Sequence, residues 1–408
     1  MMSVEEAREA ILARFHALDG EHVPVPQALG RVLARDVDAP EDLPPFANSA
    51  MDGYALRAAD IAAADDAHPV RLTLIGEVPA GSVFPGTVGA GEAVRILTGA
   101  PLPSGADAVI QQELTTPGAG TVAILAYGAA GNNVRGAGTD VPQGSRLLAR
   151  GTELGAAELA VLAAFELDPA PVTRRPRVAI LATGDELAAP GERPRPGQIR
   201  DSNSVWLAAA VAQAGAEPWP LGIARDTADD LRAHLARAAE ADLIITSGGV
   251  SVGTYDLVKD VLAEGGAVEF WRVRLRPGKP LAFGTYGATP LFGLPGNPVS
   301  SAVTFELFAR PAIRTMLGAA EIDRPLLEVE LAGEPIARGD RRHYVRARLT
   351  ARDGRLIGTP TGEQGSHRIA SLLGAGALLV IHEGEGMVAP GTLVPALSLS
   401  GRALAAAR

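Results

Sequence analysis

The chain has 408 residues, a length that suggests two to four domains at roughly 150 residues each. Its 37 Lys and Arg against 47 Asp and Glu give a net charge of −10, which argues against nucleic acid or an anionic membrane as a general partner. Cysteine is absent, which excludes disulfides, Cys–zinc sites and thiol nucleophiles. Because the N-terminus is polar and no apolar run approaches the roughly 18 residues of a membrane span, we expect a soluble, cytoplasmic protein.

The first part of the chain combines helical and β-like patterns. Apolar residues recur at helical spacing over residues 3–18, and Ser3 with Glu6 forms a capping-box pattern. Over residues 43–140 short β-like runs alternate with Gly and Pro turns. The expected strands there are residues 70–75, 93–97, 108–110 and 121–125. Helical spacing returns at residues 154–165, so we infer that the β-rich block is inserted into one helical domain.

Strands and helices alternate in the next part of the chain. The expected strands are residues 178–182, 219–223, 243–246 and 268–273, with shorter ones at 281–283 and 291–292. The expected helices are residues 204–214, 228–239, 256–263 and 299–317. This alternation predicts a doubly wound α/β domain, with a parallel sheet covered by helices on both faces. From residue 325 onward, period-two alternation predicts a small all-β domain.

The predicted architecture is therefore multidomain α/β plus β. A helical domain comprises residues 1–43 and 141–173, and a β-rich inserted domain comprises residues 44–140. The α/β domain comprises residues 174–323, and the C-terminal β domain comprises residues 324–408.

Three short motifs do not support a function. Residues 249–253 match the nucleophile elbow of serine hydrolases, but two residues separate them from the preceding strand and the candidate histidines all lie in the C-terminal β domain. Gly278 and Lys279 are not part of a Walker A sequence, because no Gly lies five residues before Gly278. The seven histidines contain no pair at zinc-ligand spacing.

Four loops of the α/β region lie where doubly wound sheets bind ligands, after a strand or before a helix. They are residues 183–187, 247–253, 276–280 and 293–301. The glycines and serines of loop 247–253 suit backbone binding of an anion, although an ordinary strand-to-helix turn has the same composition. Asn297 and Pro298 are typical of the N-cap and first residue of a helix, whose free N–H groups attract anions, and Ser300 lies in its first turn.

Charged residues in these loops have both a structural and a functional interpretation. Arg276 and Lys279 bracket a Pro-Gly turn that should hold both cations in place, although solvated surface charges are the commoner outcome. Glu186, Asp226 and Asp256 lie where acids favour helix starts, yet carboxylates near phosphates also suit Mg²⁺. Together the loops predict a pocket for an anionic, phosphate-bearing ligand with a divalent cation.

A further polar segment lies in the β-rich block, at residues 44–55. On composition alone it predicts a rigid entry followed by a turn at Asp52 and Gly53. Thr98 and Asp140 likewise lie in segments that are typical of turns.

Five ordered motifs nevertheless give the chain a specific resemblance. Residues 48–54, 183–187, 247–253, 277–280 and 293–300 occur in the order found in the molybdopterin molybdenumtransferase family, the MoeA proteins of bacteria, which are related to the gephyrin E domain. The resemblance covers essentially the whole chain. It implies an elongated homodimer with four domains per subunit, in which residues 1–43 and 141–173 serve dimerisation and the α/β domain resembles the molybdopterin adenylyltransferase MogA.

The resemblance also implies a reaction, a cofactor and partners. Members of this family insert molybdate into adenylyl-molybdopterin and release AMP, which gives molybdenum cofactor (Mo-molybdopterin), and they require Mg²⁺. Adenylyl-molybdopterin and molybdate are then the substrates, and other proteins of molybdenum-cofactor biosynthesis are candidate partners.

The resemblance assigns roles residue by residue. The implied catalytic residues are Asp52, Thr98, Asp140, Glu186, Asp226, Asp256 and Lys279. The implied substrate-binding residues are Thr183, Gly248, Gly249, Ser251, Arg276, Gly278, Lys279, Pro295, Gly296, Asn297, Ser300, Arg346 and Ser366. Among these, Glu186, Asp226 and Asp256 are the implied Mg²⁺ ligands, and the implied molybdate contacts are Lys279, Ser300, Arg346 and Ser366. The site is expected to be completed across the dimer, with the inserted block of one subunit facing the α/β domain of the other.

Two departures and three alternatives accompany this interpretation. Arg276 stands where many relatives have Lys and Arg200 stands where an aromatic is common, so anion geometry and pterin stacking are expected to differ. The alternatives are an adenylyltransferase that uses ATP, a pterin-binding scaffold without activity, and a transferase that handles tungstate. Residues 48–54 and the C-terminal β domain weigh against the first, and the charges of Asp52, Glu186 and Lys279 weigh against the second. Molybdate and tungstate share shape and charge, so the sequence does not separate them.

Overall fold

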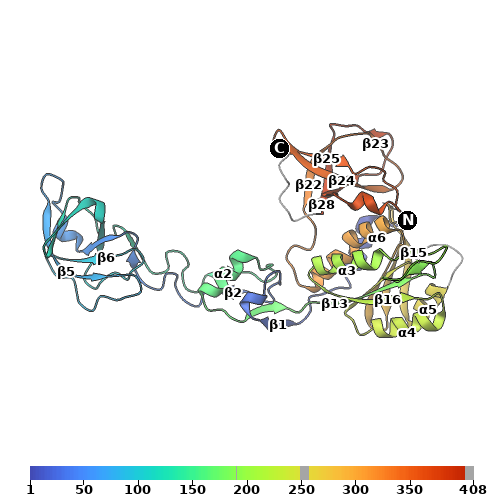
Figure 1. Cartoon of the computed structure of the whole chain (residues 1–408), viewed down its shortest axis with the longest axis horizontal. Helices are drawn as coiled ribbons and strands as arrows, with labels where there is room; N and C mark the ends of the chain where they lie inside the picture. Colours follow the sequence, from blue (N-terminus) through green and yellow to red (C-terminus); the bar gives the residue numbers. More distant parts are fainter. Residues whose placement is uncertain (190, 249–256, 400–408) are drawn as a thin grey trace. The chain divides into compact units, whose positions relative to one another are not determined.

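The computed structural model describes residues 1–189, 191–248 and 257–399 of the chain (Figure 1). It divides the chain into two compact units. The first comprises Met1–Arg35, Arg150–Leu159 and the residues from Asp168 onward, and the second comprises Asp36–Ala149 and Ala160–Leu167. Most of the second unit is thus one uninterrupted segment enclosed in sequence by the first, while the finer boundaries of four domains stay a prediction.

The second unit is built on a six-stranded sheet in the order β7-β4-β6-β5-β9-β8. Its strands are β4 (Gly53–Leu56), β5 (Val70–Val78), β6 (Glu92–Ile96), β7 (Ala108–Gln111), β8 (Thr115–Gly118) and β9 (Thr121–Ile124). Short pairs join β2 (Val37–Asp38) to β11 (Arg146–Leu148) and β3 (Asn48–Ser49) to β10 (Val134–Arg135). Two 3-10 turns, η2 (Ala58–Ile61) and η3 (Gln112–Leu114), complete it. The predicted β-rich character of this block is confirmed.

The helices near the N-terminus are shorter than predicted. Helix α1 (Val4–Leu12) starts with the expected capping box, in which Ser3 and Glu6 bond each other's backbone N–H groups, but it ends six residues before Leu18. The backbone N–H of Leu18 instead donates to the carbonyl oxygen of Met316, so a tertiary contact holds this residue. Helix α2 comprises Ala156–Ala164. The 3-10 turn η1 (Val25–Gln27) and the pair β1 (Gly20–Val23) and β12 (Ala170–Thr173) lie near them in sequence.

The α/β part of the first unit holds a six-stranded sheet in the order β16-β13-β17-β21-β20-β18. Its strands are β13 (Arg177–Thr183), β16 (Glu217–Ala224), β17 (Leu243–Ser247), β18 (Gly266–Arg272), β20 (Pro280–Tyr286) and β21 (Thr289–Leu294). The pairs among β16, β13, β17 and β21 are parallel, whereas β20–β21 and β18–β20 are antiparallel. The prediction of a wholly parallel sheet is therefore wrong at this edge. Only residues 287 and 288 separate β20 from β21, and parallel neighbours need a crossover of about a dozen residues.

Helices cover both faces of this sheet, as predicted (Figure 1). The helices of this part are α3 (Asn203–Gln213), α4 (Ala228–Ala238), α5 (Leu257–Gly265), α6 (Pro298–Thr304) and α7 (Arg310–Met316). Leu207 of α3 and Val299 of α6 share a buried core with Ile180 on one face. Leu231 and Leu235 of α4 pack with Leu181 on the other. The short pair β14 (Leu187–Ala188) and β15 (Ile199–Arg200) precedes α3.

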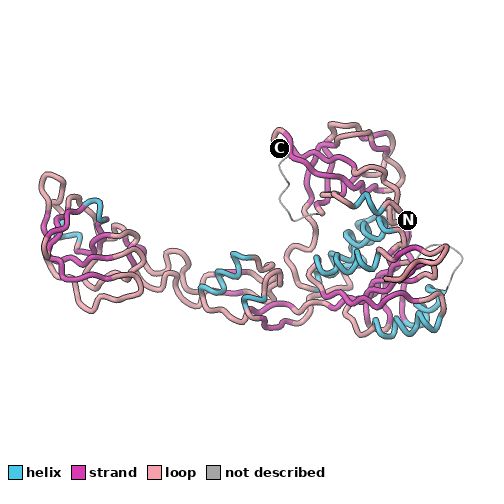
Figure 2. The backbone as a smooth tube through the Cα atoms, viewed as in Figure 1, coloured by secondary structure: helices cyan, strands magenta, loops and turns pink. Residues whose placement is uncertain are grey.

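The C-terminal part is a small β structure, drawn mostly as strand in Figure 2. Its sheet has the order β19-β24-β25-β22-β28-β26, and a further pairing of β24 with β26 closes it into a ring. The strands are β19 (Leu275–Arg276), β22 (Leu326–Leu331), β24 (Arg342–Arg352), β25 (Arg355–Pro360), β26 (Ala377–Ile381) and β28 (Leu393–Ser398). A separate pair joins β23 (Ile336–Ala337) to β27 (Met387–Val388), and η5 (Ile369–Leu372) is a 3-10 turn. Because β19 comes from the α/β part, the loop that follows it is anchored to this sheet.

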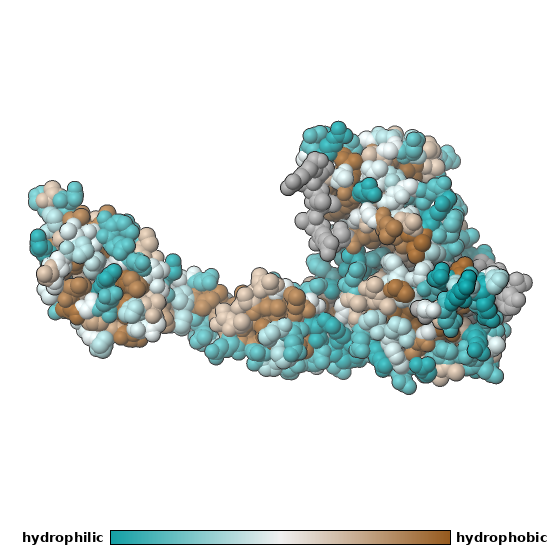
Figure 3. Space-filling model, in the orientation of Figure 1, coloured by the Kyte–Doolittle hydropathy of each residue, from teal (hydrophilic) through white to brown (hydrophobic). Residues whose placement is uncertain are grey.

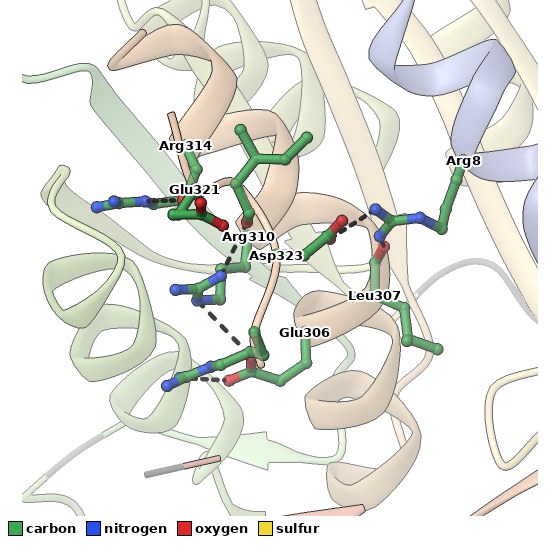
Figure 4. A network of polar contacts seen from close by, with 9 residues as sticks. Arg8, Glu306, Leu307, Arg310, Arg314, Glu321 and Asp323 are labelled. Carbon is green, nitrogen blue, oxygen red and sulfur yellow. Dashed lines mark hydrogen bonds and ion pairs between the residues drawn. The ribbon is translucent and has the colours of Figure 1, made fainter. Parts of the chain in front are cut away.

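The helix predicted at residues 299–317 is interrupted by a π-helical segment, η4 (Phe305–Ala309), between α6 and α7. From this segment Glu306 accepts hydrogen bonds of 3.0 and 3.2 Å from Arg324. Arg310 donates to the carbonyl oxygen of Ile322 at 3.0 Å, and Arg314 donates to that of Glu321 at 3.3 Å (Figure 4). These bonds hold residues 321–324, which connect the α/β part to the C-terminal β structure, against η4 and α7.

Candidate active site

The carboxyl ends of β13, β17 and β21, called the crevice below, form the expected ligand site of this sheet. The strand order β16-β13-β17-β21 reverses direction in sequence between β13 and β17, and ligands of open α/β sheets bind at such a switch point. Thr183 ends β13, Ser247 ends β17 and Leu294 ends β21. The side chains of Thr183 and Ser247 are buried, so two of these strand ends carry buried polar groups.

Backbone contacts bring three of the predicted loops together here. The N–H of Gly248 donates to the carbonyl oxygen of Leu294 at 3.0 Å. Gly248 has a φ of +99°, and a Cβ placed on it would lie 2.9 Å from the carbonyl oxygen of Thr183. A Cβ on Gly296 would lie 3.8 Å from the Cα of Gly248. The predicted substrate residues Thr183, Gly248 and Gly296 are therefore neighbours, whereas Gly249 and Ser251 lie outside the described residues.

Asn203, the first residue of α3, joins two of these loops. Its Nδ2 donates to the Oγ of Ser247 and to the carbonyl oxygen of Gly296, each at 2.8 Å. Sequence reasoning did not assign this residue to the site. A polar residue at the start of the helix that follows the first parallel strand was the available signal.

The predicted Mg²⁺ ligands are only partly brought together. The backbone N–H of Asp226 donates to the carboxylate of Asp185 at 3.3 Å, and the N–H of Asp185 donates to the carboxylate of Asp226 at 3.4 Å. The Glu186 carboxylate folds back, so that a Cβ on Gly184 would lie 2.4 Å from it. Asp256 lies outside the described residues. No group of three or more acidic or histidine side chains is arranged to hold a metal within residues 1–189, 191–248 and 257–399.

A second group of predicted residues surrounds the start of α6. Ser300 is buried in its first turn, and the N–H of the preceding Val299 donates to the carbonyl oxygen of Ser366 at 3.0 Å. A Cβ on Gly278 would lie 2.7 Å from the Cγ2 of Thr304, so loop 276–280 packs against the last residue of the same helix. The backbone carbonyl of the half-buried Lys279 accepts a hydrogen bond of 2.9 Å from Val273, whereas its ammonium group makes no hydrogen bond or ion pair with any described residue.

Helix α6 itself begins where the sequence predicts. Asn297 occupies the N-cap position and Pro298 the first helical position, directly after Pro295 and Gly296. The Asn297 side chain, however, makes no capping hydrogen bond, so the expected capping contact is absent. The N–H groups of the first turn therefore lack this side-chain acceptor, which suits the approach of an anion.

Arg346 lies beneath this group and is fully buried, with 0% exposure. Its guanidinium donates to the Oγ of Ser371 at 3.0 Å and to the carbonyl oxygens of Gln364 and Gly365 at 3.2 Å each. Burial lowers the pKa of Arg346 to about 10. These contacts hold the loop that carries Ser366, and direct contact with molybdate stays a prediction.

Arg276 is exposed and faces a separate small cavity of about 260 Å³, next to His343. Strand β19 places Arg276 opposite His343 of β24. Burial, together with Arg276, Arg346 and Arg341, lowers the pKa of His343 to about 4. The imidazole is therefore neutral near pH 7, and both its nitrogens lack a hydrogen-bond partner among the described residues.

The second unit carries the predicted pair Asp52 and Thr98, and the structure brings the two together. The N–H and the hydroxyl of Thr98 donate to the same carboxylate oxygen of Asp52, at 2.7 and 2.8 Å. These two bonds hold the pKa of Asp52 below its usual range. Asp140 is exposed and its N–H donates to Leu43, and no hydrogen bond joins it to Asp52 or Thr98 in the part of the chain that the structure describes.

Comparison with known proteins gives this arrangement a family. The MoeA N-terminal region (domain I and II) matches residues 2–165, a probable molybdopterin binding domain matches residues 179–315, and the MoeA C-terminal region (domain IV) matches residues 328–399. The chain belongs to the MoeA family. The predicted resemblance and the multidomain α/β plus β architecture are therefore confirmed.

Individual MoeA relatives cover nearly the whole chain. Molybdopterin molybdenumtransferase 2 of Mycobacterium tuberculosis is 42% identical over 399 residues, which are 96% of this chain and 98% of that protein. The molybdopterin molybdenumtransferase of Nostoc is 41% identical over 388 residues, 93% of this chain and 89% of that one. The crystal structure of a molybdopterin biosynthesis MoeA protein from Pyrococcus horikoshii has a TM-score of 0.86 at 33% identity, and the match covers 98% of this chain and 100% of that chain.

Proposed function

We propose that this protein is a molybdopterin molybdenumtransferase, which inserts molybdate into adenylyl-molybdopterin and releases AMP. The observation that carries the proposal is the path of residues 294–300. This segment runs from the crevice, where Leu294 and Gly296 meet Gly248, to the start of α6, where Ser300 lies close to Ser366. One loop thus links the crevice, proposed to bind phosphate, to the residues around Ser300, proposed to bind molybdate. The reaction needs these two substrates side by side. Relatives of 42% and 41% identity carry that name.

The residues at the two ends of segment 294–300 suit the two substrates in their chemistry. In the crevice, the glycine backbone at Gly248 and Gly296 permits close approach of the phosphates of an adenylylated pterin. Near α6, the Lys279 ammonium and, in the first turn of the helix, the hydroxyl and N–H of Ser300 offer donors to a tetrahedral dianion. Release of AMP would then occur beside the groups that bind molybdate, because residues 294–300 reach both.

We include Mg²⁺ in the proposal, with Asp226 and Glu186 as ligands together with Asp256. The close approach of Asp185 to Asp226 adds a carboxylate that the sequence had left outside the ligand set. All four groups offer oxygen, which is the donor that Mg²⁺ prefers beside phosphates. When bound, the ion would neutralise the charge that develops on the AMP phosphate.

We also propose that the protein acts in the cytoplasm as a homodimer. Helix α2 is apolar apart from Glu158, and apolar side chains gather on the surface over it (Figure 3). Leu162 is its single buried residue. An exposed helix of this composition favours an interface with a second copy, as the resemblance implies. No helix in the described ranges is both long and apolar enough to cross a bilayer.

The test is AMP release from adenylyl-molybdopterin by the purified protein, with and without molybdate and with and without Mg²⁺. We expect release that requires both, and tungstate in place of molybdate establishes the metal preference. Tight pterin binding without AMP release under any condition would contradict the transferase, and formation of adenylyl-molybdopterin from ATP would replace it with the adenylyltransferase.

If the dimer shares its sites, two inactive variants should restore activity when mixed. Asp52→Ala and Lys279→Ala lie in different units of the chain, so one site of a mixed dimer would hold both native residues. Activity of the mixture after exchange of subunits, approaching a quarter of wild type, is the expected result. Two variants that stay inactive in a demonstrated mixed dimer would place both residues in a site within one subunit.

A further inference from the structure

The ends of β17 and β21 are held together by one side chain that the proposed reaction does not yet use. The amide nitrogen of Asn203 has two hydrogens, and it bonds the Oγ of Ser247 and the carbonyl oxygen of Gly296 at 2.8 Å each. The carbonyl oxygen of Gly296 only accepts hydrogen bonds, which fixes the nitrogen on that side of the amide. Asn203 therefore bridges the end of β17 and the loop that follows β21.

The position of Asn203 is rigid because α3 is anchored at its first turn and also along its buried face. The carboxylate of Asp201 accepts a hydrogen bond of 3.0 Å from the N–H of Ser204, which fixes the first turn of α3. Further along, Leu207 and Val211 are fully buried against the sheet. A side chain on such a helix start keeps its place better than one on a loop.

The bond to Ser247 also decides what the serine hydroxyl can do. A hydroxyl has one hydrogen to donate and two lone pairs that accept. Because Asn203 occupies a lone pair of Ser247, the hydroxyl hydrogen stays available for an acceptor. The adjacent Gly248 lies where a phosphate would approach, so a phosphate oxygen is the acceptor that this geometry favours.

We propose that Asn203 is a positioning residue for the adenylylated pterin: it sets the distance between the end of β17 and the loop after β21 and turns the Ser247 hydroxyl toward a substrate phosphate. The proposal rests on the proposed function, and it adds two residues, Asn203 and Ser247, to the set that the sequence implied. It acts through Ser247 and Gly296, so Asn203 itself need not touch the substrate.

The matched test is Asn203→Asp, which keeps the shape of the side chain and removes both donors. A carboxylate repels the Gly296 carbonyl oxygen and accepts the Ser247 hydrogen, which is then lost to the substrate. With two hydrogen bonds broken, we expect KM for adenylyl-molybdopterin, and its dissociation constant measured without molybdate, to rise roughly tenfold. The kcat should change less. Asn132→Asp is the control, because the Asn132 amide also donates to a carbonyl oxygen, that of Val109, but in the β-rich unit.

A double substitution separates the positioning role from a merely structural one. Ser247→Ala should raise KM in the wild-type background, but should add little in the Asn203→Asp background, where the hydroxyl is already turned away. Equal effects in the two backgrounds would overturn the coupling through Ser247. A lower melting temperature with unchanged KM and dissociation constant would show a structural role only. Absence of AMP release by wild-type protein would instead remove the proposed function, while the binding measurements would still decide the role of Asn203.

Discussion

The crevice of the α/β sheet and the Asp52–Thr98 pair are two polar sites that are built in opposite ways. The crevice collects groups from three strand ends, and its side chains Thr183 and Ser247 are only 6% and 4% exposed. Asp52 and Thr98 are both exposed, and two local hydrogen bonds to one carboxylate oxygen define the pair. The first site depends on the packing of the whole sheet, whereas the second depends on two residues. Substitutions in the crevice should therefore lower stability together with activity, whereas substitutions of Asp52 or Thr98 should mainly lower activity.

The largest effect is expected at Lys279, which has no partner among the described residues. Lys279→Ala should lower kcat/KM on the order of a thousandfold, because it removes a charge that faces the oxyanion. The melting temperature should not change, since no hydrogen bond or ion pair within the described ranges is lost. Arg352→Ala is the control, because that cation is 81% exposed on a hairpin of the C-terminal β structure. Wild-type turnover in Lys279→Ala would remove this residue from the site.

A loss on the order of a hundredfold is expected for Asp52→Ala, with only a small loss of stability because the two hydrogen bonds from Thr98 are exposed to solvent. Thr98→Val sharpens the comparison, because the Thr98 hydroxyl helps to hold the pKa of Asp52 below its usual range. Without that donor the pKa of Asp52 should rise. If the ionised carboxylate is required, the acid limb of the rate–pH profile should move to higher pH. The same profile as wild type, with Thr116→Val as control, would show that ionisation of Asp52 does not limit the reaction.

Arg346 should behave unlike both cases, because its guanidinium is bound to the protein rather than free. Arg346→Ala would leave the carbonyl oxygens of Gln364 and Gly365 without their donor. We expect a loss of stability on the order of 3 kcal/mol, measured by denaturant unfolding, and a higher KM for molybdate because the Ser366 loop is released. Unchanged stability with a loss of turnover like that of Lys279→Ala would instead indicate direct contact with the substrate.

The smallest effect on activity is expected at His343, whose substitution should instead change the pH dependence of stability. The pKa of His343 is lowered to about 4 in the folded protein, below its ordinary value of 6.5. Its contribution to stability is therefore full above about pH 6.5 and is lost as pH falls toward 4, by roughly 3 kcal/mol in total. His343→Leu should flatten the free energy of unfolding over that range. The exposed His68, in His68→Leu, is the control. An unchanged slope in His343→Leu would contradict the assignment.

Much of the α/β architecture follows from periodicity, while the contacts that decide the site do not. Alternation of strands and helices predicted the covered sheet, and glycines at strand ends predicted the crevice. The antiparallel edge was missed because the sequence predicted strand only at residues 281–283 and 291–292, which conceals the two-residue turn between β20 and β21. The π-helical segment at residues 305–309 was missed because its apolar spacing also fits an uninterrupted helix.

Side-chain partners were the least predictable feature of the site. Asp52 and Thr98 are 46 residues apart, and only the resemblance placed both in one set. The amide of Asn203 reaches residues 44 and 93 positions away, so no local pattern marks it as a bridge. Arg346 was expected at the ligand only from the resemblance, and its complete burial against a loop is decided by tertiary packing.

The central claim is that molybdate enters adenylyl-molybdopterin in the step that releases AMP. The most direct measurement is the amount of AMP released and of molybdenum bound to the pterin, followed together over a single turnover with Mg²⁺. The account predicts equimolar amounts that rise at the same rate, and neither product without molybdate. AMP release that proceeds without molybdenum in the pterin would contradict it, because hydrolysis rather than metal transfer would then be the reaction of this site.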